Sequence, residues 1–135
     1  GHVSAIEVDA AAGAVRFLDA DQSAPLEFRF DGVLDGESSQ EQAFDSVCRD
    51  AVQDCLGGYN SIICFCGQTS TGKTYTMCGP MPQFAATSPW QSRGLVQRSL
   101  ELVFQELDRQ QAETPDDKYI CYCSFLEIFD ERISD

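Results

Sequence analysis

Positive charge is scarce in this sequence of 135 residues. Lysine and arginine together number nine, against 22 aspartate and glutamate residues, which gives a formal net charge of -13. Because so acidic a surface repels other polyanions, we expect no binding to nucleic acid or to acidic membrane surfaces. The one basic cluster that the sequence offers is Lys73, with Arg93 and Arg98 further along the chain.

Long apolar runs are also absent. No stretch approaches the roughly 18 consecutive apolar residues that indicate a transmembrane helix. The first residues lack the basic-then-apolar layout of a signal peptide, so we expect neither a membrane span nor a secretory leader. The hydrophobic content of 43% is sufficient for one domain with a core at this length.

A complete disulfide framework is lacking too, because the seven cysteines are an odd number. Without a secretory signal they indicate a reducing compartment, where cysteine behaves as a small buried hydrophobe. Two Cys-x-Cys pairs, Cys64/Cys66 and Cys121/Cys123, lie in strand-like runs, and strand alternation puts each pair on one face. Zinc sites normally use a wider spacing on loops, so we interpret both pairs as core packing.

What the sequence does contain is a phosphate-loop pattern between a strand-like run and a helix start. Ile62–Cys66 is unbroken apolar sequence, typical of a strand with both faces covered. The next eight residues fit G-x-x-x-x-G-K-[ST]: Gly67, Gln68, Thr69, Ser70, Thr71, Gly72, Lys73 and Thr74. A surface loop rich in glycine, serine and threonine is the alternative, but it leaves the adjoining apolar run unexplained.

The chemistry of phosphate binding accounts for this spacing. Gly67 and Gly72 allow the backbone to curl so that successive N–H groups face an anion. Lys73 adds a compact positive charge that can reach the β- and γ-phosphates, and the Thr74 hydroxyl is placed to ligate Mg²⁺. The pattern therefore predicts a nucleotide site over residues 67–74.

Before the loop, the sequence predicts a small hairpin and one helix. The hairpin covers residues 3–18, with strands at 5–8 and 14–18, and an edge strand follows over 26–30. Ser38 and Glu41 form a capping-box pattern at the helix start, and Gly57 and Gly58 end the helix. Its predicted buried stripe consists of Phe44, Val47, Cys48, Ala51, Val52, Cys55 and Leu56.

After the loop, glycine and proline interrupt the helix that follows Lys73. Residues 78–92 form an excursion that holds Phe84 and Trp90, which either bind a ligand or pack back onto the domain, the interpretation that we favour. A polar turn over 110–118 then leads to a long strand over 119–129. Between the excursion and this turn, a second helix begins at Gly94, with a predicted buried face of Leu95, Val96, Leu100, Val103, Phe104 and Leu107.

Together these motifs resemble the N-terminal part of a kinesin motor domain. The resemblance implies an α/β fold, a P-loop NTPase of the kinesin type with a partial central sheet flanked by helices. Residues 1–135 would be the N-terminal portion of that domain, with the phosphate-loop strand and helix over 61–77. Gln97 stands where the family usually has proline. The carrying stretches cover roughly residues 26–135: Phe30–Val33, Gln40–Glu41, Gly58–Asn60, Gly67–Met77, Gly94–Arg98 and Ser124–Phe129.

By this resemblance, residues 67–74 would hold the phosphates of ATP or ADP, Thr74 the Mg²⁺, and Tyr75 would stack on adenine. The excursion over 78–92 corresponds to a small-molecule site in some kinesins. The parent protein would couple ATP hydrolysis to microtubule-based movement in the cytoplasm, on the cytoskeleton. The segments that sense the γ-phosphate and those that bind microtubules come later in the family, so we expect no catalytic residue within this chain.

We therefore expect the chain to be a fragment without ATPase activity of its own. A missing segment or a partner chain would complete its sheet, because an unpaired strand edge is costly. The alternative is a degenerate kinesin-like structural or interaction module with little or no ATPase activity, since a fold does not fix a function.

Overall fold

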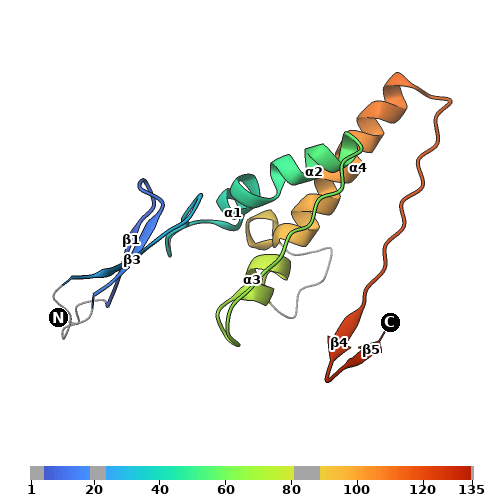
Figure 1. Cartoon of the computed structure of the whole chain (residues 1–135). Helices are drawn as coiled ribbons and strands as arrows, with labels where there is room; N and C mark the ends of the chain where they lie inside the picture. Colours follow the sequence, from blue (N-terminus) through green and yellow to red (C-terminus); the bar gives the residue numbers. More distant parts are fainter. Residues whose placement is uncertain (1–4, 19–23, 81–88, 135) are drawn as a thin grey trace. The chain divides into compact units, whose positions relative to one another are not determined.

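The computed structural model describes residues 5–18, 24–80 and 89–134, as two compact units that divide between Leu102 and Val103. Figure 1 shows small sheets and helices, which are consistent with part of an α/β domain. The expected central sheet is not among the described residues, whose strands form one three-stranded and one two-stranded antiparallel sheet. No helix in the described part of the chain is long and apolar enough to cross a membrane.

The first unit begins with the predicted hairpin. β1 (Ile6–Asp9) pairs antiparallel with β2 (Ala14–Phe17), and β3 (Leu26–Arg29) adds to the other side of β2. β3 is thus an edge strand, as its alternating sequence predicts. Across this sheet the rings of Phe17 and Phe28 meet edge to face, with centroids 5.7 Å apart.

The helix predicted to follow is present, but its cap is one residue later than predicted. Ser39 caps α1 (Gln40–Val47): its hydroxyl accepts from the Gln42 N–H at 3.1 Å, and the Gln42 side chain accepts from the Ser39 N–H at 2.7 Å. Ser38 cannot take that role because its hydroxyl donates to Asp35 Oδ1 at 2.9 Å. The predicted capping box at Ser38 and Glu41 is therefore wrong by one position.

The predicted single helix is also divided at Cys48, where α2 (Arg49–Leu56) begins. The apolar stripe has a spacing of four: Phe44, Cys48 and Val52 are buried, whereas Val47 and Cys55 are exposed, contrary to prediction. Gly58, with a φ of 94°, follows the end of α2 in the left-handed conformation that the sequence predicts there.

A small core lies where α1 meets the start of α4 (Leu95–Glu113). Ala43, Phe44, Cys48 and Leu95 form its buried centre. The half-buried hydrophobic residues that pack against this centre are Ile63, Phe65 and Leu102.

The apolar run before the phosphate loop is extended but is not a strand. Ile63 and Phe65 face the core, while Ile62 is 88% exposed and Cys64 and Cys66 are also exposed. A strand requires a neighbour for its backbone groups, and no neighbour pairs with residues 61–66 among the described residues. The predicted buried strand, and the core packing of its cysteine pair, are therefore not found here.

The helices after the phosphate loop begin as predicted. α3 (Lys73–Cys78) ends before Gly79, which has a φ of 80°, and the 3₁₀ helix η1 (Trp90–Ser92) leads to α4. α4 continues to Glu113 and so replaces part of the predicted polar turn. Leu95 is buried, but Val96, Leu100 and Phe104 are between 37% and 52% exposed, which corrects the predicted buried face.

The second unit contains the end of α4 and a short hairpin. β4 (Glu127–Phe129) pairs antiparallel with β5 (Arg132–Ser134), so the predicted strand over 119–129 is present only in its last three residues. Residues 118–126 are extended without a ladder partner in the described chain, and Tyr122 is 91% exposed. Cys121 and Cys123 are exposed as well, so the core packing predicted for them is wrong.

Candidate phosphate-binding site

The phosphate loop connects the extended segment to α3 and turns sharply at three residues. Gly67, Ser70 and Gly72 have φ values of 143°, 67° and 90°. At Gly67 a Cβ atom would lie 2.8 Å from Thr71 Oγ1, so the close turn depends on glycine. Gly72 instead faces open space and caps α3 in the left-handed conformation. The loop therefore has the curled backbone that its two glycines predict.

Lys73 lies at the centre of this curl. Its Nζ donates to the carbonyl oxygens of Gly67 at 2.7 Å and of Gln68 at 2.5 Å. Gln68 O also accepts the Thr71 hydroxyl at 2.8 Å, which closes the loop on itself. Lys73 as a residue is half-buried and residues 67–72 are exposed, and both hydrogen bonds of its ammonium group lie at the solvent-facing side of the loop.

These features fit a nucleotide phosphate. A phosphate oxygen is an acceptor like the two carbonyl oxygens that Lys73 contacts, and it carries a full negative charge that strengthens the hydrogen bond. Gly72 leaves room for close approach to the backbone beside Lys73. Thr74 and Tyr75 are both exposed on the first turn of α3 and are therefore accessible from solvent.

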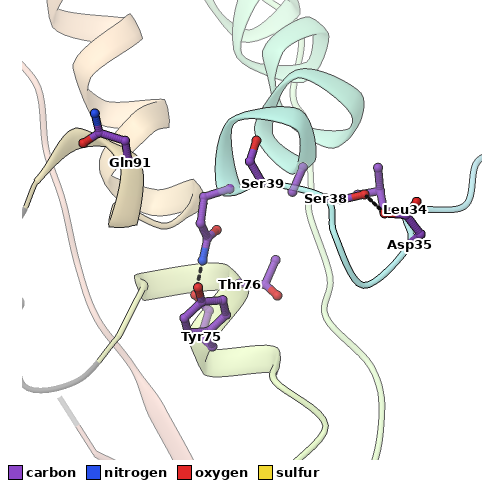
Figure 2. Close-up of a pocket in the computed structure, with 9 residues that line it drawn as sticks. Leu34, Asp35, Ser38, Ser39, Tyr75, Thr76 and Gln91 are labelled. Carbon is purple, nitrogen blue, oxygen red and sulfur yellow. Dashed lines mark hydrogen bonds between the residues drawn. The ribbon is translucent and has the colours of Figure 1, made fainter.

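The carbonyl of Tyr75 is bonded by a residue that the sequence did not single out as part of the site. Gln40, 7% exposed, donates from Nε2 to Tyr75 O at 2.8 Å, the hydrogen bond dashed in Figure 2. This contact borders a cavity of about 290 Å³ between the N-terminus of α1 and α3, lined by Leu34, Asp35, Ser38, Ser39, Gln40, Ala43, Tyr75, Thr76 and Gln91.

The end of α3 and the start of α4 meet at two glycines. A Cβ on Gly94 would lie 2.5 Å from Gly79 N and 2.6 Å from Cys78 N, so the two backbones are in direct contact. Gln97 adds a hydrogen bond at the same contact, because its Nε2 donates to Cys78 O at 2.7 Å. We call this contact of residues 78–79 with residues 94 and 97 the loop junction.

Arg98 is buried beside the junction and does not belong to a basic surface. Its guanidinium donates to Trp90 O at 2.8 Å and Arg93 O at 3.0 Å and stacks 4.1 Å from the Trp90 ring. Burial lowers the pKa of Arg98 from its ordinary value. Arg93 forms an ion pair with Glu101, so both arginines are engaged by neighbours of their own. The Trp90 ring lies against the Arg98 guanidinium but stays 42% exposed, so the packing favoured for it is only partial, while Phe84 lies outside the described residues.

Two of these contacts had a signal in the sequence. Gln40 precedes Phe44 and Cys48 at intervals of four, which places it on the buried stripe of the helix. Arg98 follows Leu95 by three, which places it on the buried side of α4. We find no such signal for Gln97. The structure groups no three metal-binding side chains within its described ranges.

Comparison with known proteins identifies the family. Residues 5–135 match the family model described as kinesin motor domain. The chain is 44% identical over 110 residues to kinesin-like protein KIN-12B of Oryza sativa subsp. japonica, a match that covers 80% of this chain and 10% of that protein. It is 39% identical over 112 residues to human kinesin-like protein KIF15, covering 82% of this chain and 8% of that protein.

The chain thus spans about a tenth or less of the length of these relatives. The match to the family model nevertheless extends over almost all of its residues, and it includes the phosphate loop. On this basis the chain belongs to the kinesin motor domain family.

Proposed function

We propose that this chain is the nucleotide-binding segment of a kinesin-like microtubule motor, with ATP and ADP as its ligands. The observation that carries the proposal is the position of the Lys73 ammonium group, inside a loop that turns at Gly67 and Gly72. A positive charge held there, facing solvent, is what binding a nucleotide polyphosphate requires.

Each residue of the loop has a role in this proposal. Lys73 exchanges the carbonyl oxygens of Gly67 and Gln68 for phosphate oxygens, and residues 67–72 surround the phosphates with backbone. Thr74 holds Mg²⁺ through its hydroxyl, and the exposed ring of Tyr75 stacks on adenine. When bound, Mg²⁺ neutralises charge on the phosphates.

Catalysis and movement belong to the whole motor in this proposal. Phosphoryl transfer depends on several groups that position water and stabilise charge together, and the phosphate loop is one of them. We assign ATP hydrolysis, microtubule binding and location on the cytoskeleton to the longer protein. Further strands of that protein would pair with residues 61–66 and 118–126, whose backbone has no ladder partner in the described chain.

Calorimetric titration of Mg-ATP and Mg-ADP into the chain tests the proposal. The chain contains only two lysines, Lys73 and Lys118, so Lys118→Ala is a control that removes the same charge elsewhere. We expect saturable binding by the wild-type chain and by Lys118→Ala, and at least a tenfold loss of affinity in Lys73→Ala, because a charged hydrogen bond contributes about 1.5–3 kcal/mol.

Equal affinity in the two variants would contradict a role for Lys73. No binding by any of the three, with the helices intact by circular dichroism, would favour the interaction-module alternative for this chain.

For the microtubule proposal, we expect the isolated chain, with its net charge of -13, to stay in the supernatant when microtubules are pelleted. Saturable pelleting would place a microtubule-binding surface within these residues.

A further inference from the structure

The helix that carries Lys73 and Thr74 has few contacts of its own. α3 is six residues long, and none of its residues is buried. Helices this short are unstable in water by themselves, because nucleation costs more than one turn of hydrogen bonds returns. Its position must therefore depend on contacts with the neighbouring helices.

Two glutamine side chains supply such contacts, one from before α3 in the sequence and one from after it. Gln40 on α1 donates to Tyr75 O at 2.8 Å, and Gln97 on α4 donates to Cys78 O at 2.7 Å. Both hydrogen bonds are partly buried, and they join residues 35 and 19 positions apart. α3 is thus bonded to two other helices through the backbone carbonyls of Tyr75 and Cys78.

Both amides carry a cost that packing alone does not explain. The Oε1 atoms of Gln40 and Gln97 are buried and have no hydrogen-bond partner among the described residues. A buried acceptor without a partner is destabilising, so an apolar side chain of the same length would pack at lower cost. Unlike an apolar side chain, the amide at each of these two positions donates a hydrogen bond to α3.

We propose that Gln40 and Gln97 are positioning residues for the nucleotide site, an inference that rests on the proposed function. By fixing the Tyr75 and Cys78 carbonyls, they set the position of α3 and hence of Lys73 and Thr74 at its start. Gln97 acts through the loop junction, where the backbones of residues 78–79 and Gly94 are in direct contact.

Hydrogen exchange of the α3 amides tests this inference without nucleotide. Gln40→Met and Gln97→Met keep the length of the side chain but remove its donor, and Gln53→Met makes the same change at an exposed position of α2. We expect the amides of residues 76–79 to exchange about three- to tenfold faster in the first two variants and at the wild-type rate in the third.

Global stability separates positioning from a general structural role. Because each methionine also removes an unpaired buried oxygen, we expect the urea midpoint of the whole chain to stay near the wild-type value while α3 exchange rises. Unchanged α3 exchange would overturn the inference. Equal acceleration in α1, α3 and α4 would also overturn it, because the variants would then have lost overall stability.

Nucleotide affinity separates this inference from the proposed function. If the wild-type chain binds Mg-ATP, we expect Gln40→Met and Gln97→Met to weaken binding several-fold and Gln53→Met to leave it unchanged. Unaltered affinity alongside faster α3 exchange would show that the amides do not position the site. If the wild-type chain does not bind, the proposed function fails for this chain, and the exchange rates still decide whether the two amides hold α3.

Discussion

Residues 40–56 and residues 61–66 follow each other closely in the sequence, yet the first form two helices and the second remain extended and unpaired. A helix completes its backbone hydrogen bonds within four residues, so α1 and α2 need only a surface on which to bury Phe44, Cys48 and Val52. A strand must find its partner elsewhere in the chain. The same difference separates α4 from residues 118–126.

The buried core of the described residues therefore depends on the helices. Ile63 and Phe65 contribute to the core only through one side of an extended segment, and Ile62 on the other side is 88% exposed. Substitutions should therefore have large effects in the helical core and small effects at the exposed positions of the extended segments.

Phe44→Ala should give the largest effect. Phe44 is 3% exposed at the centre of the core, so its removal should lower the free energy of unfolding by about 3–5 kcal/mol, measured by urea denaturation followed by circular dichroism. Ile62→Ala is the matched change in the extended segment and should cost less than about 0.5 kcal/mol. Similar losses in both variants would show that the extended segment is as well packed as the helices.

Gly94→Ala should have the next largest effect. Its Cβ would lie 2.5 Å from Gly79 N and 2.6 Å from Met77 C, so the backbones of α3 and α4 must separate. We expect a loss of about 1–3 kcal/mol in the same denaturation experiment. Gly36→Ala is the control, because a Cβ there meets nothing within 4 Å. A neutral Gly94→Ala would contradict the direct contact at the loop junction.

Ser39→Ala should have a smaller effect, limited to the start of α1. Loss of an N-cap hydroxyl costs about 1 kcal/mol, which thermal unfolding can detect. Ser38→Ala provides the comparison, because its hydroxyl bonds to Asp35 rather than to the helix and its loss should change stability less. A larger loss of stability in Ser38→Ala than in Ser39→Ala would mean that Ser38, not Ser39, caps α1.

The smallest effect should be a pH dependence in α4. Hydrogen bonds from Arg109 and Gln110 lower the pKa of Glu106 to about 2. Because this pKa lies below the ordinary carboxylate value of 4.5, the stabilisation by ionised Glu106 is complete above pH 4.5 and is lost as the pH falls towards 2. An NMR titration of the Glu106 carboxylate should therefore have a midpoint near 2. A midpoint near 4.5 would mean that these contacts are too exposed to matter.

The sequence is most successful in predicting features that depend on residues close together in the chain. The curled loop over 67–72, the end of α3 at Gly79 and the left-handed Gly58 follow from local backbone chemistry, and the structure confirms them. Ser38 and Ser39 show the limit of local patterns. Each is followed three residues later by Glu or Gln, so both fit a capping box, and Asp35 decides between them by bonding Ser38.

The rest depends on contacts between distant residues. The unbroken apolar run over 62–66 and the alternation over 119–129 are both typical of strands, but pairing requires a neighbour that neither pattern specifies. The contacts of Gln40 with Tyr75 and of Gln97 with Cys78 likewise appear only once three helices are in place. The nucleotide ligand, the roles of residues 67–75 and the microtubule partner stay predictions.

The loop junction has a further consequence for how this chain can vary. The backbone leaves α3 at Gly79 and enters α4 at Gly94, and these two points are in direct contact. This contact fixes α3 against α4 whatever the length of the chain between the two glycines. We expect a reporter peptide inserted between Pro80 and Pro89 to leave Lys73 in place, because such an insertion keeps the contacts of Arg98 with Trp90 and Arg93. The junction therefore makes the interval between these two prolines a suitable place for an engineered insertion.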